Sequence, residues 1–425
     1  MRKGMEIILG KTEINRDLIF LLVIGGLYSL GIFLSNTFVN VYLWKQAGDY
    51  TTIAVYNLAI FIFQPITFIF AGIIAKKIDR IIVLRLGVSF LSLFFLAVLF
   101  LAEKSATYNF LLGGLLGIGY GFYWLAYNVL TFEITEPDTR DFFNGFLGVL
   151  QSLGGMIGPL AAGMIIVYLS DDIGYTVIFA VSFALFIGAV VCSFFLKRRQ
   201  AEGDFYFKRV LQERSRNKNW RKILDAHLFQ GLREGIFGFV ITIWVYLVTK
   251  SELSLGMFNL YCSGLSFVAY FLATKYIKPS RRKKAILFGA GMLFFSLFII
   301  LIHMNYTTLI IYAVIIGIAY PILTVPYTSM TFDVIGKASK AKELRVEYIV
   351  VRELFANIGR VVSILIFLLA IMFMDPVKII PVLLIIFGAG HFLVYIFIKD
   401  IYLTSLPKNK KDIPIKDQLS DEKNR

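Results

Sequence analysis

The sequence is poor in charge and in cysteine. Only 17% of its 425 residues are charged, whereas about a quarter are charged in a soluble globular domain. The two cysteines, Cys192 and Cys262, cannot form a zinc set, and both fall inside apolar runs, where they serve as small packing residues. No nucleotide-binding P-loop is present. These absences argue against a soluble domain, a disulfide scaffold and an ATP-driven pump.

Apolar residues are abundant, making up 58% of the chain, with a mean hydropathy of +0.75. They gather in runs near the roughly 20 residues that a bilayer-spanning helix requires. The runs are 18–44, 51–75, 82–102, 108–131, 142–169, 175–196, 223–248, 255–277, 285–304, 308–331, 348–372 and 377–398. The first run is too long for a signal peptide and lacks a cleavage site. The predicted fold class is an all-α multi-pass membrane protein with about twelve transmembrane helices.

Basic residues set the expected orientation. Although the net charge is +15, no basic stripe on a soluble domain indicates nucleic-acid binding. The basic residues gather in alternate loops, around 76–85, 275–284 and 337–345, whereas the other loops carry few. By the positive-inside rule the basic loops and both termini are cytoplasmic. The bilayer is therefore the expected partner, and the plasma membrane the expected location.

The second half of the chain repeats the first. Gly-Ile-Phe at 31–33 recurs at 235–237, and Val-Tyr-Leu at 41–43 recurs at 245–247, both displaced by 204 (235 − 31). Gly-Ile at 117–118 and Thr-Phe at 131–132 recur at 317–318 and 331–332, displaced by 200 (317 − 117). Two halves related by an axis along the membrane normal are a recurrent transporter plan, with the binding site between them near the midplane.

The expected domains follow from this repeat. They are a cytoplasmic lead at 1–16, a six-helix bundle at 17–196, a central linker at 197–222, a second six-helix bundle at 223–400 and a polar cytoplasmic tail at 401–425. The linker is either an amphipathic segment on the membrane surface, anchored by Phe205, Tyr206, Phe207 and Trp220, or a solvated connection between the halves.

The fifth predicted helix is rich in small residues. It contains Gly145, Gly154, Gly158, Pro159 and Gly163, which favour close packing of a neighbouring helix and a bend at the proline. Ordinary packing explains this pattern, but the full spacing also resembles the antiporter motif of the drug:proton antiporter-like branch of the major facilitator superfamily. That resemblance implies export by proton antiport and a seal on the cytoplasmic side.

Two loops resemble charge motifs of the same superfamily. In the loop after the second helix, Gly72 and Arg80 match the superfamily signature, but Lys76 occupies its aspartate position. Asp79 is therefore expected to supply the anion that meets the N-terminus of the eleventh helix. Glu133 and Arg140 resemble the glutamate–six–arginine element, which the repeat relates to Asp333 and Lys340. The expected cytoplasmic gate, or alternatively a set of topology anchors, is Lys77, Asp79, Arg80, Glu133, Arg140 and Asp333.

The resemblance implies that helices one, four, seven and ten line a central cavity, with two, five, eight and eleven around them. Polar and aromatic residues occur on these helices at helical spacing. The candidate lining residues are Asn36, Asn40, Asn57, Tyr120, Trp124, Tyr127, Asn128, Gln230, Tyr320, Thr324 and Tyr327. Packing inside each bundle is the alternative role for the aromatic ones.

Charged residues deep within the predicted helices are confined to the second half. They are Arg233 and Glu234 in helix seven and Arg352, Glu353 and Arg360 in helix eleven, where Asn357 shares a face with Glu353 and Arg360. Each charge at the centre of a spanning helix costs about 2.5–3.5 kcal/mol on insertion scales. The repeat places uncharged Ser29 and Leu30 opposite Arg233 and Glu234 (233 − 204).

This cluster has two interpretations. It is either a set of ion pairs that braces the second bundle or a site for protons and substrate. Burial favours a neutral carboxylic acid and a nearby arginine favours the carboxylate, so a moving arginine can switch protonation. Glu234 is the first candidate proton carrier and Glu353 the second, while Arg233 and Arg360 are candidates to bind an anionic group. His227, His303 and His391 are expected at interfacial or packing positions.

The predicted function is secondary active transport of the major facilitator type. The protein is expected to export a small amphipathic or anionic molecule by proton antiport through alternating access, as a monomer. It is not expected to be an enzyme or to bind a metal or cofactor, and the proton gradient is the expected energy source. The alternatives are an importer or symporter, a flippase for a lipid-linked molecule, a polytopic membrane enzyme and a membrane partner without transport activity.

Overall fold

The computed structural model describes residues 16–401, apart from 135–136, 170 and 199–202. Within these ranges the chain is helical, and twelve spans are long and apolar enough to cross a membrane. The first bundle contains α2 (Arg16–Ala47), α3 (Tyr50–Lys77), α4 (Arg80–Leu101), the 3₁₀ turn η1 (Ala102–Lys104), α5 (Asn109–Ile134), α6 (Pro137–Leu169) and α7 (Asp171–Ser193). The predicted all-α multi-pass fold is confirmed.

The second bundle begins after a linker helix, α8 (Phe207–Arg216). It contains α9 (Lys218–Thr249), α10 (Glu252–Tyr276), the 3₁₀ turn η2 (Pro279–Arg281), α11 (Arg282–Ile302), α12 (Tyr306–Gly336) and α13 (Arg345–Phe373). The twelfth span is divided into α14 (Pro376–Gly388) and α15 (Gly390–Ile398) by Ala389. Helix α9 therefore begins within the range expected for the linker, because Asn217 caps it by accepting from the backbone N–H of Asn219 and Trp220.

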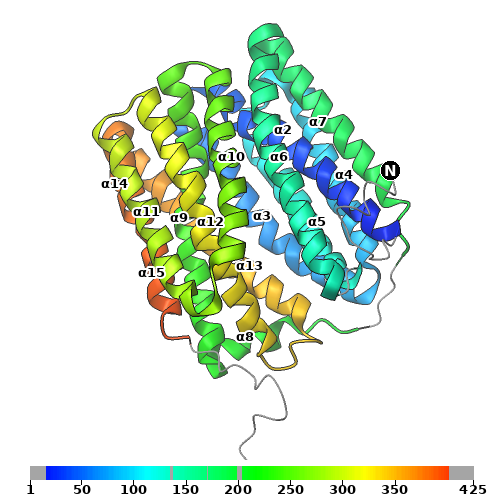
Figure 1. Ribbon diagram of the computed structural model, residues 1–425. Coiled ribbons are helices and arrows are strands. Elements are labelled where there is room, and N and C mark those ends of the chain that lie inside the picture. The colour runs from blue at the N-terminus through cyan, green and yellow to red at the C-terminus, as the bar shows by residue number, and fades with distance from the viewer. Residues whose placement is uncertain (1–15, 135–136, 170, 199–202, 402–425) are drawn as a thin grey trace, which may run out of the picture.

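The two bundles stand side by side and repeat the same internal packing (Figure 1). In the first, α2 packs on α6 and α3 on α5; in the second, α9 packs on α13 and α10 on α12. The bundles meet where α6 packs on α10 and where α3 packs on α13. Helices α6 and α10 run side by side in the upper half of Figure 1 and diverge below. We call the end with Lys76, Lys77 and Arg345 the basic end; its cytoplasmic orientation stays a prediction.

The linker packs against the second bundle. Trp220 is fully buried, and its indole N–H donates to the carbonyl of Val210 at 3.3 Å. Its ring meets Tyr348 of α13 edge-on. Phe205 lies against Gly72 of α3, where an added Cβ would come within 2.7 Å of the phenyl ring. The linker is thus neither a solvated connection nor a lipid-facing segment at these residues, because Trp220 and Phe205 bury their apolar surface against protein.

Three glycines bring α9 and α13 into close contact. A Cβ added at Gly231 would lie 2.0 Å from the carbonyl oxygen of Ala356, and one at Gly359 would lie 2.1 Å from that of Leu228. At Gly235 the nearest backbone atom, the carbonyl oxygen of Arg360, would be 2.6 Å away. Small residues four apart allow this approach of two membrane helices. The contact fixes the distance between the charged residues of α9 and α13.

Adding a side chain at this contact is expected to separate the two helices. We expect Gly231→Ala to lower the free energy of unfolding by about 1–3 kcal/mol, the usual effect of overpacking. The matched control is Gly238→Ala on the same helix, where an added Cβ meets nothing within 4 Å. Thermal unfolding of the two purified variants measures the difference. Equal transition midpoints would contradict a tight α9–α13 contact.

Candidate transport site

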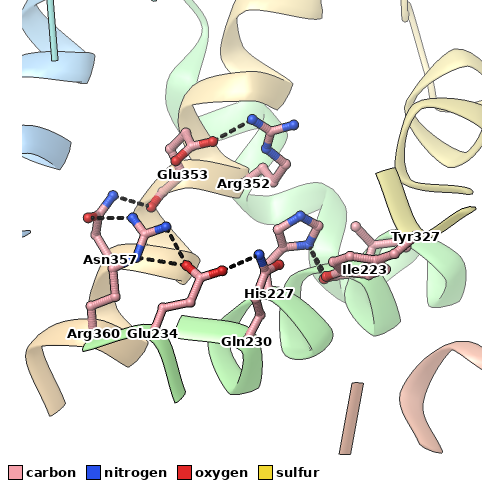
Figure 2. A network of polar contacts seen from close by, with 9 residues as sticks. All are labelled: Ile223, His227, Gln230, Glu234, Tyr327, Arg352, Glu353, Asn357 and Arg360. Atoms are coloured by element: carbon pink, nitrogen blue, oxygen red, sulfur yellow. Dashed lines mark hydrogen bonds and ion pairs between the residues drawn. The ribbon is translucent and has the colours of Figure 1, made fainter. Parts of the chain in front are cut away.

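A buried carboxylate on α9 forms the centre of the polar network in Figure 2. Glu234 Oε2 accepts from Arg360 of α13, from Nη2 at 2.7 Å and from Nε at 3.1 Å. Its Oε1 accepts from Gln230 Nε2 at 2.7 Å and from the Tyr320 hydroxyl of α12 at 3.1 Å. The Glu234 and Arg360 side chains are 17% and 18% exposed. The carboxylate is therefore fully hydrogen-bonded but still reachable by water.

A second ion pair lies one to two turns nearer the basic end on α13. Glu353 pairs with its neighbour Arg352, and its backbone carbonyl accepts from Asn357 Nδ2 at 2.9 Å. Asn357 Oδ1 in turn accepts from Arg360 Nη1 at 3.1 Å, which joins the two pairs (Figure 2). The predicted face of Glu353, Asn357 and Arg360 is therefore a connected network.

His227 extends this network toward α12. Its Nδ1 lies 2.6 Å from the Tyr327 hydroxyl and 2.9 Å from the carbonyl oxygen of Ile223. Both rings are buried inside the second bundle, His227 at 8% and Tyr327 at 2% exposure. His391 on α15 is fully buried too, although the sequence suggested a peripheral position. Both histidines therefore belong to the interior.

Arg233 takes no part in the ion pairs of its neighbours. Its guanidinium lies over the Phe237 ring, 4.3 Å from the centroid. Among the described residues it forms no hydrogen bond or ion pair, and its Nε is buried without a partner. The sequence grouped Arg233 with Glu234, but the structure separates their side chains.

The network faces the first bundle through Arg360, whose guanidinium lies 5.2 Å from the centroid of the Phe61 ring on α3. The polar candidates of the first bundle lie on α2 and α3, where Asn57 Nδ2 donates to Asn40 Oδ1 at 2.9 Å. Asn36 Oδ1 is buried without a hydrogen-bond partner. These amides provide neutral polar groups on helices α2 and α3 of the first bundle.

The aromatic lining candidates divide into two groups. Tyr320 contacts Glu234, and Thr324 lies 3.4 Å from the Tyr270 hydroxyl on α10, so both belong to the region between helices. Tyr127 is 2% exposed and donates to the carbonyl of Leu21 on α2 at 3.1 Å. Its repeat partner Tyr327 is held by His227 in the same way. Tyr127 and Tyr327 therefore fix their bundles internally, which is the packing role that the sequence left as the alternative to lining a cavity.

The remaining lining candidates lie on α5. Tyr120 and Trp124 pack against the apolar core, with Trp124 edge-on to Tyr28 of α2 at 5.3 Å between ring centroids. Asn128, one turn beyond Trp124, is partly exposed. Tyr120, Trp124 and Asn128 give α5 an amphipathic surface beside α2.

At the basic end, Lys76 joins the two bundles. Its Nζ lies 2.7 Å from Glu347 Oε1 in the first turn of α13 and donates to the carbonyl of Glu343 at 2.7 Å. The same Glu347 oxygen accepts from the backbone N–H of Tyr206 in the linker at 3.1 Å. Lys76 stands where the superfamily signature has an aspartate, so the α3–α13 contact is made with its charges reversed.

The predicted gate residues therefore act differently from the expectation. Asp79 does not reach α13: it caps α4 through the Ile81 N–H at 2.7 Å and pairs with Arg198 at 3.2 Å. Asp333 pairs with Arg282 at 2.6 Å within the second bundle. Lys77 is exposed, and Arg80 begins α4. The side chains of Glu133, Arg140 and Gly145 lie outside the described residues.

At the opposite end, a different ion pair joins the bundles. Lys45 of α2 lies 3.1 Å from Glu252 of α10, which also accepts from the Tyr175 hydroxyl at 3.1 Å. The small residues of α6 support this end, because an added Cβ at Gly163 would lie 2.6 Å from the carbonyl oxygen of Glu252. Gly154 and Gly158, which precede Pro159 on α6, pack instead on Ser29 and Leu34 of α2.

Helix α6 thus contacts the second bundle in its half away from the basic end. An added Cβ at Gly148, nearer the basic end, meets nothing within 4 Å, and Leu153 is exposed. Tyr270 on the facing half of α10 is exposed as well. The α6–α10 interface is therefore closed at one end and separated toward the other.

Among the described residues no group of three or more His, Cys, Asp or Glu could hold a metal ion.

The chain belongs to the Major Facilitator Superfamily, because the model of that family matches residues 21–363. A crystal structure of an E. coli fucose:proton symporter, FucP, resembles this fold with a TM-score of 0.63 at 15% sequence identity, covering 91% of this chain and 98% of that one. The superfamily consists of transporters rather than enzymes, so this chain is an integral membrane transporter of small molecules.

Relatives also match at the sequence level. The Bacillus subtilis (strain 168) protein named Uncharacterized protein YqgE is 57% identical over 394 residues, which cover 93% of this chain and 92% of the relative. A Geobacillus stearothermophilus protein, Uncharacterized protein in sodM 3'region, is 57% identical over 197 residues, 46% of this chain and 92% of that relative.

Reversing one charge of the Lys76–Glu347 pair is expected to separate α3 from α13 at the basic end. Lys76→Glu or Glu347→Lys leaves like charges together, and breaking a buried pair costs about 3–5 kcal/mol. The double variant K76E/E347K restores the pair with its direction reversed. Spin labels at the exposed positions Lys77 and Lys342 report the separation by pulsed electron paramagnetic resonance.

We expect longer distances in each single variant and the wild-type distance in the double variant. A double variant with distances as long as those of the single variants would contradict an inter-bundle ion pair at this position. The matched control is Arg282→Glu, because the Arg282–Asp333 pair lies within one bundle and its loss leaves the labels in place.

Proposed function

We propose that this protein is a proton-coupled secondary transporter in which Glu234 carries the coupled proton. The observation that supports this role is the Glu234–Arg360 pair, a buried carboxylate held by a guanidinium, an amide and a hydroxyl between α9, α12 and α13. Ionisable residues within a membrane are costly and are concentrated at proton and substrate pathways. The groups that face Glu234 are Gln230, Tyr320 and Arg360, with Glu353 and His227 beyond them.

Protonation of Glu234 changes the network in a defined way. The neutral acid loses its ion pair with Arg360, so the guanidinium is left with Asn357 and the Phe61 ring. Because Phe61 belongs to α3 and Arg360 to α13, the change occurs at a contact between the two bundles. Charge at Glu234 therefore biases the relative position of the bundles, which is the motion that alternating access requires.

The two end contacts supply the alternative closed states. Lys76–Glu347 joins α3 to α13 at the basic end, and Lys45–Glu252 joins α2 to α10 at the opposite end. Each pair crosses between bundles, so opening an end requires that its pair separate. Glu234 lies between these two ends along the spans, where it can respond to both.

Proton antiport with export is the form of coupling that we favour for an amphipathic substrate. The spacing of glycines in α6 resembles the antiporter motif, and the structure uses Gly154, Gly158 and Gly163 to pack α6 between α2 and α10. A substrate that binds the Glu234 carboxylate competes with the proton for it. Substrate and proton then occupy the site in turn, which is antiport.

The Arg360 contact favours a second form of coupling if the substrate is anionic. An anion that displaces Glu234 from Arg360 removes the positive charge that keeps Glu234 ionised. By linkage, anion binding then promotes proton binding, which is proton symport. The sign of the response to an imposed pH gradient separates the two forms, because antiport moves substrate against the proton flow and symport moves it along.

Neutralising Glu234 is expected to abolish proton-driven transport. We expect Glu234→Gln to lose transport driven by a pH gradient in proteoliposomes loaded with a substrate panel, because the amide cannot carry a proton. Exchange of substrate across the membrane without a gradient is retained, since the glutamine preserves the shape of the site. The control is Glu103→Gln at an exposed carboxylate in η1, which leaves both activities unchanged. Gradient-driven transport by Glu234→Gln at the wild-type rate would remove Glu234 from the mechanism.

A further inference from the structure

The interior of the second bundle carries an unbalanced positive charge. Three arginines, Arg233, Arg352 and Arg360, face two glutamates, Glu234 and Glu353, within the spans of α9 and α13. Each glutamate is already matched by one arginine, Glu234 by Arg360 and Glu353 by Arg352. Arg233 is left without an anionic partner among the described residues. A buried charge without a partner is strongly unfavourable, so we expect Arg233 to bind an anion that is not part of the described chain.

The surroundings of Arg233 contain a second group with unused hydrogen-bonding capacity. His391 is fully buried, and neither ring nitrogen has a partner among the described residues. Its helix is held against Arg233, because an added Cβ at the adjoining Gly390 would lie 3.5 Å from Arg233 Cβ. The Tyr320 ring of α12 lies 6.5 Å from the His391 ring, centroid to centroid.

Two unsatisfied polar side chains thus belong to neighbouring positions of α9 and α15, where Gly390 packs on α9, with the Tyr320 ring of α12 near His391. Arg233 is 6% exposed and His391 is not exposed at all. A guanidinium has only donors, and an imidazole ring donates through its N–H, so both groups suit an acceptor that carries negative charge. Their burial restricts that acceptor to a small ion or to one end of a larger molecule.

We propose that Arg233 and His391 form an anion-binding site for a small monovalent anion, either a free halide or the carboxylate group of a substrate. The site is separate from the Glu234–Arg360 pair, since Arg233 is directed to Phe237 and α15 while Glu234 is directed to α13. It does not depend on Glu234 carrying a proton, because binding at equilibrium is measured without transport.

The test is thermal unfolding of the purified full-length protein in chloride, bromide or acetate, each against methanesulfonate, which is neither a halide nor a carboxylate, at constant ionic strength. We expect a saturable rise of the wild-type midpoint with a small anion, since a ligand bound only by the folded state stabilises it. Arg233→Met removes this response. Arg233→Lys retains it, and His391→Phe raises the half-saturating concentration about tenfold, the effect of one lost hydrogen bond to a charged group.

When no binding anion is present, the arginine variants are expected to differ in the direction in which their unfolding temperature changes. In methanesulfonate we expect Arg233→Met to unfold at a higher temperature than the wild type, because it removes an unpaired buried charge. The matched control is Arg85→Met, which also removes an arginine stacked on an aromatic ring, Phe194, but one that donates to the Ser193 carbonyl. It lowers stability and leaves the anion response intact.

The two sources of the anion are distinguished by relative potency. Half-saturation at lower acetate than chloride assigns the site to a substrate carboxylate, whereas half-saturation at lower chloride assigns it to a free halide. A wild-type midpoint that is the same in all four salts overturns the proposal, whether or not the variants fold. An anion response that survives in Arg233→Met overturns it as well.

Discussion

The Glu234–Arg360 ion pair is the interaction on which the rest of this structure depends. A carboxylate within a membrane span is tolerated only when it is paired with another group, and here the partner, Arg360, lies on another helix. This pairing requires α9 and α13 to approach closely. They can do so at Gly231, Gly235 and Gly359, because glycine has no side chain to keep the two helices apart. The same approach places Arg360 against Phe61 of α3. One ion pair thus joins the packing of the second bundle to its contact with the first.

The sequence predicted the helices well because each span is a long apolar run, and the repeat predicted two similar six-helix halves. It also located the charged cluster, since charges in apolar runs are rare. It did not predict the partner choice within the cluster. Arg233 and Glu234 are adjacent on α9 yet take different partners, whereas Arg352 and Glu353, also adjacent, pair with each other. The partners of Arg233 and Glu234 depend on which face of α9 packs against α13. Gly231 and Gly235, two small residues four apart on either side of the charged pair, indicate that face, and this pattern was overlooked in the sequence.

The gate at the basic end shows a different limit of sequence reasoning. Asp79 was the nearest acidic residue to the altered signature. Its side chain instead caps the start of α4 by accepting from the Ile81 N–H. Lys76 instead pairs with Glu347, which is 271 positions further along the chain. Such a reversed pair is visible only when both helix ends are placed in space. The choice between lining and packing for Tyr127 and Tyr327 likewise depends on placement in space, because a tyrosine on a predicted lining helix can turn its hydroxyl toward its own bundle.

The central claim is that Glu234 gains and loses a proton in the folded protein. Infrared difference spectroscopy of the membrane-embedded protein, titrated with pH, tests it most directly because it observes the carbonyl stretch of a protonated carboxylic acid. The account predicts a band that appears on acidification, is absent in Glu234→Gln and persists in Glu353→Gln. A band that persists in Glu234→Gln and disappears in Glu353→Gln would contradict the assignment and move the proton to α13.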